Sequence, residues 1–245
     1  MAAKKSVTKT APKPAKNPAP KAPAPLDLRA ALAALQKHAT RQDRANLDRF
    51  GIVTADKVLG VSMKNIQAVA AQIGRNHALA EALWASGCHE ARLLTAYIAN
   101  PARVTPAQMD RWAKDFDNWA VCDTLCFKLW DQSPHAWSKV ETWTGKRDEY
   151  VKRAGFALLA SLALHDKSSG NDAAYRDGLK RIEEEATDER NFVKKGVLWA
   201  LRGIATRNAT MKREATATAK RLAASDDATS RWIGKTALRE MAKRV

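Results

Sequence analysis

Residues 150–159, YVKRAGFALL, recur as FVKKGVLWAL at residues 192–201, an offset of 42 residues, and a weaker third copy, WIGK, begins at residue 232. A period near 40 residues with two helices per unit is typical of HEAT-like repeats. Such units stack side by side into a curved solenoid with a concave binding face. The repeat therefore predicts an all-α, HEAT-like or armadillo-type solenoid of antiparallel helix pairs.

The sequence outside the repeat has the same helical periodicity. Leu28, Leu32 and Leu35 recur at the three- and four-residue spacing of one helix face. Only three of the nine prolines lie after residue 25, and alternation of β-branched residues is nearly absent. Glycine, proline and polar signals predict helix ends near Gly51, Gly60, Gly74, Gly87, Pro101, Pro134, Gly170, Asn208 and Ser225. This spacing gives roughly ten helices of about 10–20 residues.

The chain is strongly basic, with a formal net charge of +16. Residues 1–25 hold six lysines, six prolines and no acidic residue, so we expect a disordered tail followed by a single domain over 26–245. The excess charge on the body predicts a polyanionic partner bound on a basic concave face, with nucleic acid ahead of a membrane surface. The tail either adds nonspecific attraction to phosphates or acts as a solubilising leader.

Several function classes lack their sequence signals. There is no phosphate-binding glycine loop, dinucleotide fingerprint or zinc spacing, and the five histidines do not pair at ligand spacing. Cys88, Cys122 and Cys126 have no C-x-x-C spacing and fit small buried thiols in a reduced, cytoplasmic protein. No apolar run of about 18 residues or signal-peptide pattern is present. We therefore expect neither a metal nor another cofactor, and no membrane.

Trp119 and Asp123 are the most unusual pair in the chain. They are four residues apart and so share one face of a helix. A ring face beside a carboxylate suits a cationic or cation-forming ligand. Each residue alone also fits a structural role, the tryptophan in the core and the aspartate in a surface ion pair. Trp112, Trp130, Trp137 and Trp143, from the same tryptophan-rich region, are expected to pack in the core.

The repeat also places cations at matching positions. Arg153, Lys195 and Lys235 occur at the same point of the three copies, so stacking would align them for contact with a phosphate backbone. Ordinary solvated cations remain the alternative for these residues.

Several stretches in the same order resemble the DNA alkylation repair family, the AlkD-like HEAT-repeat DNA glycosylases. The similarity runs from about Phe50 to the C-terminus. The stretches are RFGIV at 49–53, AEALW at 80–84, HEAR at 89–92, WAVCD at 119–123, VKRA at 151–154, GVLWALR at 196–202 and KREA at 212–215. WAVCD is similar to the family's W-D-x-x-D signature, except that Ala120 replaces the first aspartate.

The resemblance implies a monofunctional glycosylase that hydrolyses the N-glycosidic bond of cationic N3- or N7-alkylated purines in duplex DNA, without base flipping. It implies Asp123, Trp119 and Trp199 as catalytic residues. It also implies DNA-backbone contacts from Arg153, Arg202, Lys195, Lys212 and Arg213. We expect a monomer that associates with the nucleoid when bound to DNA. The rival readings are a noncatalytic HEAT-repeat scaffold for DNA or RNA and a protein-binding HEAT adaptor, which the basic charge fits poorly.

Overall fold

The computed structural model describes residues 27–166 and 169–243, so the tail predicted for residues 1–25 lies outside the described residues. The described residues form helices and no β-strand, apart from one isolated β-bridge between Lys57 and Cys88. Its α-helices are α1 (Leu28–Gln36), α2 (Arg41–Arg49), α3 (Met63–Ile73), α4 (His77–Ala85), α5 (His89–Ile98), α6 (Pro106–Lys114), α7 (Trp119–Lys128), α8 (Ala136–Trp143), α9 (Glu149–His165), α10 (Asp172–Glu184), α11 (Asn191–Ala205), α12 (Ala209–Ala223) and α13 (Ala228–Ala242). Three short 3-10 helices are η1 (Pro101–Arg103), η2 (Trp130–Gln132) and η3 (Ser169–Asn171).

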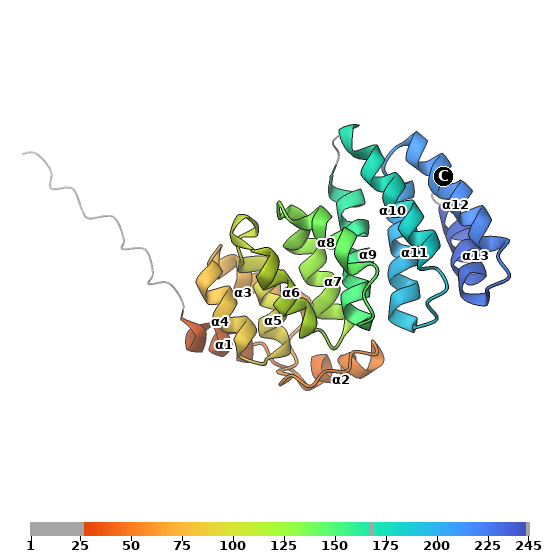
Figure 1. Cartoon of the computed structure of the whole chain (residues 1–245). Helices are drawn as coiled ribbons and strands as arrows, with labels where there is room; N and C mark the ends of the chain where they lie inside the picture. The colour runs from red at the N-terminus through yellow and green to blue at the C-terminus, as the bar shows by residue number, and fades with distance from the viewer. Residues whose placement is uncertain (1–26, 167–168, 244–245) are drawn as a thin grey trace, which may run out of the picture.

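The helices stack in chain order from one end of the molecule to the other (Figure 1). One layer is formed by α3, α5, α7, α9, α11 and α13, each of which packs against the next. Within a repeat, α4 packs on α5, α8 on α9, α10 on α11 and α12 on α13. This arrangement confirms the predicted all-α solenoid of helix pairs.

The predicted breaks fall between helices for a local reason. Asparagine, serine, threonine and aspartate side chains cap most helix starts by accepting a hydrogen bond from a backbone N–H of the first turn, as Asn118 does for α7 and Asn208 for α12. Gly51, Gly60, Gly74 and Gly87 have positive φ, which glycine adopts without a steric penalty. The α-helices before α9 are more numerous and shorter than expected, at eight to eleven residues each, because these caps and glycines interrupt the chain.

Most of the tryptophans pack in the hydrophobic core. Trp112, Trp130 and Trp143 are buried, and Trp137 is partly buried against the core, as predicted. The ring centroids of Trp84 and Trp112 stack at 4.7 Å, and those of Trp130 and Trp143 lie 5.2 Å apart. These aromatic contacts join neighbouring helix pairs into one continuous core.

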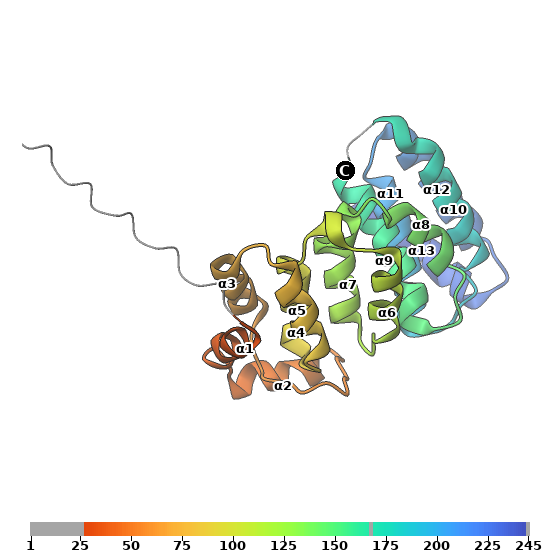
Figure 2. The same ribbon diagram turned by 60° about the vertical axis from the view of Figure 1, so that its left-hand side comes forward.

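α2 lies along one edge of the solenoid, below the stacked helices in Figure 1 and below α4 and α5 in Figure 2. The buried carboxylate of Glu90 on α5 accepts hydrogen bonds from the backbone N–H groups of Leu59, Gly60 and Val61 at 3.0, 2.7 and 3.3 Å. A carboxylate that accepts several backbone donors is a strong anchor. The H-E-x-R stretch therefore serves the fold by fixing the segment between α2 and α3. None of the helices in the described ranges combines the length and apolarity needed to cross a bilayer.

Candidate active site on helices α7, α9 and α11

Trp119 and Asp123 lie where their spacing predicts, on one face of α7. Trp119 is the first residue of the helix, directly after the N-cap Asn118, whose side chain accepts from the N–H of Val121 at 3.1 Å. Both Trp119 and Asp123 are half-buried. The indole N–H of Trp119 donates to the backbone carbonyl of Phe50 at 3.2 Å, so the ring is tied to the segment between α2 and α3.

Asp123 is held by an arginine from the neighbouring helix. Arg153 of α9 donates from Nε to Oδ1 at 2.8 Å and from Nη2 to Oδ2 at 2.7 Å. Its Nη1 donates to the backbone carbonyl of Phe192 on α11 at 2.7 Å. The exposed fraction is 8% for the Arg153 side chain and 18% for that of Asp123. The guanidinium thus links three helices of one layer: α9, which carries it, α7 through the Asp123 carboxylate, and α11 through the Phe192 carbonyl.

The electrostatics of this pair have two opposing parts. Burial raises the pKa of Asp123, and the charge and hydrogen bonds of Arg153 act to lower it. Burial also disfavours the charged form of Arg153, but Asp123 outweighs this effect and the pKa of the guanidinium is raised. The pKa of Asp123 is raised overall because burial outweighs the effect of Arg153. Arginine stays protonated in proteins, and its bidentate fork favours the ionised form of the carboxylate. Each of its oxygens has two lone pairs, so a water molecule can still donate to it.

Trp199 lies on the half-exposed side of α11 and meets an aromatic residue that the sequence analysis missed. Its ring centroid is 6.3 Å from that of Phe127, with an interplanar angle of 27°. Phe127 is four residues beyond Asp123, so Trp119, Asp123 and Phe127 form one line along α7. The four-residue spacing of Phe127 from Asp123 is the sequence signal that could have identified Phe127 as part of the site. Phe127 also contacts the ring of His165, at 4.3 Å between centroids, and His165 pairs with Asp131.

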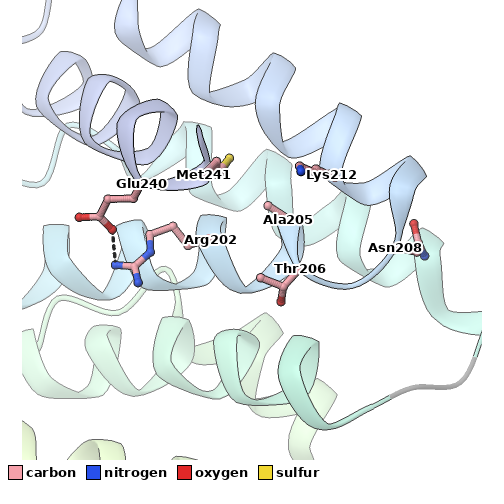
Figure 3. Close-up of a pocket in the computed structure, with 7 residues that line it drawn as sticks. All are labelled: Arg202, Ala205, Thr206, Asn208, Lys212, Glu240 and Met241. Carbon is pink, nitrogen blue, oxygen red and sulfur yellow. Dashed lines mark ion pairs between the residues drawn. The ribbon is translucent and has the colours of Figure 1, made fainter. Parts of the chain in front are cut away.

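The other predicted cations are spread beyond this cluster. Lys195 is exposed on α11, and Arg213 is exposed on α12. Arg202 pairs with Glu240 of α13, with Nη1 and Oε2 2.6 Å apart. This ion pair lines a pocket between α11, α12 and α13, and Lys212 lines the same pocket (Figure 3).

The expected row of cations is not uniform. Arg153 is buried and bonded to Asp123, whereas Lys195 and Lys235 are exposed. The three positions match in the repeat, but among these three cations only Arg153 of α9 is bonded to a carboxylate, that of Asp123 on α7. Arg153 therefore binds Asp123 in the structure, and its contact with DNA phosphates stays a prediction.

Ala120, which stands where the family signature has an aspartate, is buried in α7. A carboxylate there would have to give up its hydration, so alanine suits this packing. Cys88, Cys122 and Cys126 are free, buried thiols, and no group of three or more potential metal-binding side chains gathers within the described part of the chain.

A family model for DNA alkylation repair enzymes matches residues 31–241. The chain belongs to this family. One solved structure, described as a new family of proteins related to the HEAT-like repeat DNA glycosylases with affinity for branched DNA structures, has a TM-score of 0.71 and 20% sequence identity, and the match covers 80% of this chain and 83% of that chain. A designed armadillo repeat protein matches with a TM-score of 0.31 and 14% identity over 87% of this chain and 92% of that chain. No curated protein matches the sequence.

The match confirms the family that the motifs indicated, and the first structural neighbour confirms the HEAT-like fold of this DNA alkylation repair protein. At 20% identity the neighbour shows the fold alone. The roles of the individual site residues remain predictions.

Proposed function

We propose that this DNA alkylation repair protein is a monofunctional DNA glycosylase that hydrolyses the N-glycosidic bond of N3- or N7-alkylated purines in duplex DNA. The observation that carries the proposal is the carboxylate of Asp123, which is fixed by two hydrogen bonds from Arg153 and lies one helical turn from Trp119. Family membership supports the substrate class, since alkylated DNA is what such enzymes repair.

Hydrolysis of this N-glycosidic bond needs mainly a negative charge held close to the deoxyribose. An N3- or N7-alkylated purine is cationic and leaves as a neutral base, so its departure requires no general acid. Positive charge develops on the deoxyribose, and a fixed carboxylate stabilises that charge without reorganising. In this proposal Asp123 stabilises the sugar cation and positions or deprotonates the attacking water. Arg153 keeps the carboxylate ionised and aimed.

The aromatic residues have a complementary part. The faces of Trp119 and Trp199 carry partial negative charge, so each contact with a cationic sugar or lesion contributes about 1–2 kcal/mol when desolvated. Phe127 supports the Trp199 ring from α7. In this proposal the lesion is reached through its sugar and stays in the duplex, since Trp119, Asp123 and Trp199 are each partly exposed.

The remaining predicted contacts are with the DNA backbone. We assign phosphate contacts to Arg202, Lys195, Lys212 and Arg213, with Arg153 as a further candidate, on a basic concave face of the 26–245 domain. Phosphate contacts position a duplex without reading its sequence. In this proposal the protein acts as a monomer in the cytoplasm, associates with the nucleoid through DNA, and requires no cofactor.

The direct test is release of 7-methylguanine or 3-methyladenine from methylated duplex DNA under single-turnover conditions. Wild type should release the base, and Asp123→Asn, which keeps the shape of the side chain, should be slower by at least about a hundredfold. Asp177→Asn, which removes an exposed carboxylate on α10, is the matched control and should keep full activity. Equal activity of Asp123→Asn and wild type would remove Asp123 from the mechanism.

A noncatalytic DNA-binding scaffold is the second candidate. It is favoured by the pairing of both Asp123 oxygens with Arg153, because a carboxylate in such a pair can be purely structural. The fold neighbour, for which affinity for branched DNA structures is described, supports the same candidate. Tight binding of duplex or branched DNA without base release by the wild type would establish this alternative.

A further inference from the structure

The loop between α2 and α3 is tied to the start of α7 at two points. Near its beginning, the carbonyl of Phe50 accepts the indole N–H of Trp119 at 3.2 Å. A few residues later, the carboxylate of Asp117 accepts from the hydroxyl of Thr54 at 2.8 Å and from the N–H of Ala55 at 2.7 Å. Residues 50–53, the tip of this loop, are therefore held at both ends, beside Trp119.

This stretch exposes apolar side chains to solvent. The exposed fraction is 58% for Phe50 and 78% for Val53. Among the large hydrophobic residues that the structure describes, only Trp232 on α13 has a comparable exposure, at 40%. Because the carbonyl of Phe50 is bonded to Trp119, these exposed apolar side chains are available to a partner that binds at the candidate site.

The loop is also fixed beyond the second tie. Asp56 pairs with Arg92 of α5 at 3.1 Å, and Lys57 forms a backbone bridge with Cys88. The carboxylate of Glu90 then holds residues 59–61. Because the loop is already ordered by these contacts, a partner that binds its tip does not have to pay for ordering it.

The surroundings of the tip favour a polyanion over an apolar protein surface. Arg49 lies over the Phe50 ring, with its guanidinium carbon 6.0 Å from the centroid. Arg41 and Arg44, earlier on α2, are also exposed. Two apolar side chains cover far less area than a stable protein–protein interface buries. Apolar side chains flanked by arginine are, in contrast, how many proteins enter the minor groove of DNA.

We propose that Phe50 and Val53 form an apolar wedge that inserts between base pairs of the duplex next to the nucleotide held by Trp119 and Asp123. The wedge rests on the proposed function for its partner, duplex DNA, and adds to it how the duplex is deformed. Insertion of a large apolar side chain unstacks a base step and bends the helix. The unstacked step opens the sugar of the neighbouring nucleotide to Asp123 while the alkylated base stays inside the duplex.

The experiment uses a duplex with a noncleavable abasic-site analogue and 2-aminopurine at the adjacent step, which fluoresces when unstacked. Full-length wild type should raise the fluorescence on binding. The double variant Phe50→Ala/Val53→Ser should abolish the rise and weaken binding by roughly tenfold to a hundredfold. Phe50→Leu, with Val53 intact, keeps a large apolar side chain and should restore most of the signal.

Trp232→Ala is the matched control, because it removes the other strongly exposed hydrophobic residue and should leave the fluorescence rise unchanged. The substituted positions are exposed, and thermal melting by circular dichroism checks that each variant is folded. No fluorescence rise with wild type, or an equal rise with the double variant, overturns the wedge.

Base release, measured in parallel on methylated duplex, separates the two proposals. Release without a fluorescence rise leaves the glycosylase and removes the wedge. A wedge-dependent fluorescence rise without release leaves the wedge on a noncatalytic DNA-binding protein.

Discussion

Arg153 approaches Asp123 side-on, so that both carboxylate oxygens accept a hydrogen bond from one guanidinium, at 2.8 and 2.7 Å. This arrangement fixes the plane of the carboxylate as well as its charge. In the active-site proposal, Arg153 is a positioning residue whose removal alters the ionisation of Asp123 before it alters DNA binding.

Arg153→Gln should move the acid limb of the pH–rate profile to higher pH. Burial raises the pKa of Asp123 and Arg153 opposes this, so loss of the cation raises the pKa further. Activity requires the ionised form and is therefore lost at a higher pH as the solution is acidified. Arg153→Lys retains the charge and should shift the limb less. Single-turnover rates between pH 4 and 8 measure this, and coincident acid limbs for wild type and Arg153→Gln would exclude the positioning role.

Phe127→Ala should slow base release by roughly tenfold, because it removes the ring that stacks on Trp199 at 6.3 Å. Phe127→Leu keeps most of the volume and separates stacking from packing. In the background of Trp199→Ala, the Phe127 substitution should cost much less, since the contact is already lost. Fully additive effects in this double-mutant cycle would show that Phe127 does not act through Trp199.

Glu240→Gln should strengthen binding to undamaged duplex DNA. In the structure Glu240 Oε2 lies 2.6 Å from Arg202 Nη1. A DNA phosphate must therefore compete with Glu240 for the guanidinium. Removing the carboxylate frees one cation, so affinity should rise severalfold and the slope of log K against log salt should steepen by up to about one unit. Glu214→Gln, which frees Arg176 on α10 with the same change in net charge, is the control. An equal gain in both variants would indicate a general charge effect.

Gly234→Ala should strongly destabilise the fold. A Cβ at this position would lie 2.2 Å from the backbone nitrogen of Ala223 and 2.5 Å from the carbonyl of Ala219, where α13 crosses α12. Relieving such a clash by moving the helices typically costs about 1–3 kcal/mol or more. Gly145→Ala meets only a Glu185 oxygen at 3.9 Å and should change the free energy of unfolding little. Urea unfolding of both variants tests the difference.

Asp188→Asn should flatten the loss of stability in acid. Hydrogen bonds from Arg190, ahead of the contact with Lys152, lower the pKa of Asp188 to about 2 against the opposing effect of burial. A carboxyl whose pKa is lower in the folded state contributes stability above its unfolded pKa near 4, and this contribution disappears as the pH falls through 2. The contribution is about 2 kcal/mol at most. Denaturant melts at pH 2, 4 and 7 should show a smaller acid-induced drop in the variant than in the wild type.

The sequence predicted those features that depend on neighbours along the chain. The repeat of 150–159 at 192–201 located α9 and α11, and asparagine, proline and glycine signals located the helix ends. The four-residue spacing of Trp119 and Asp123 placed both on one face of α7. Such local rules follow from backbone geometry, so they hold without knowledge of the fold.

The contacts that shape the site depend on how helices pack, which the sequence does not state. Nothing near Arg153 in the chain indicates that its partner is thirty residues earlier. The ion pair of Arg202 with Glu240 and the tie between Trp119 and Phe50 span still longer separations. Phe127 had a usable signal in its spacing from Asp123, but an aromatic residue at that position is equally typical of a core.

The site draws one residue group from each of three consecutive helices, α7, α9 and α11. In a solenoid each repeat contacts only its neighbours, so the separation of Trp119 and Trp199 is set by two packing angles, that of α7 on α9 and that of α9 on α11. Gly203 packs against the backbone of Ala160 at this junction, with only 3.2 Å available for a Cβ. A substitution that changes the packing angle of α9 on α11, such as one at Gly203, should therefore change the separation of Trp119 and Trp199 without altering either side chain.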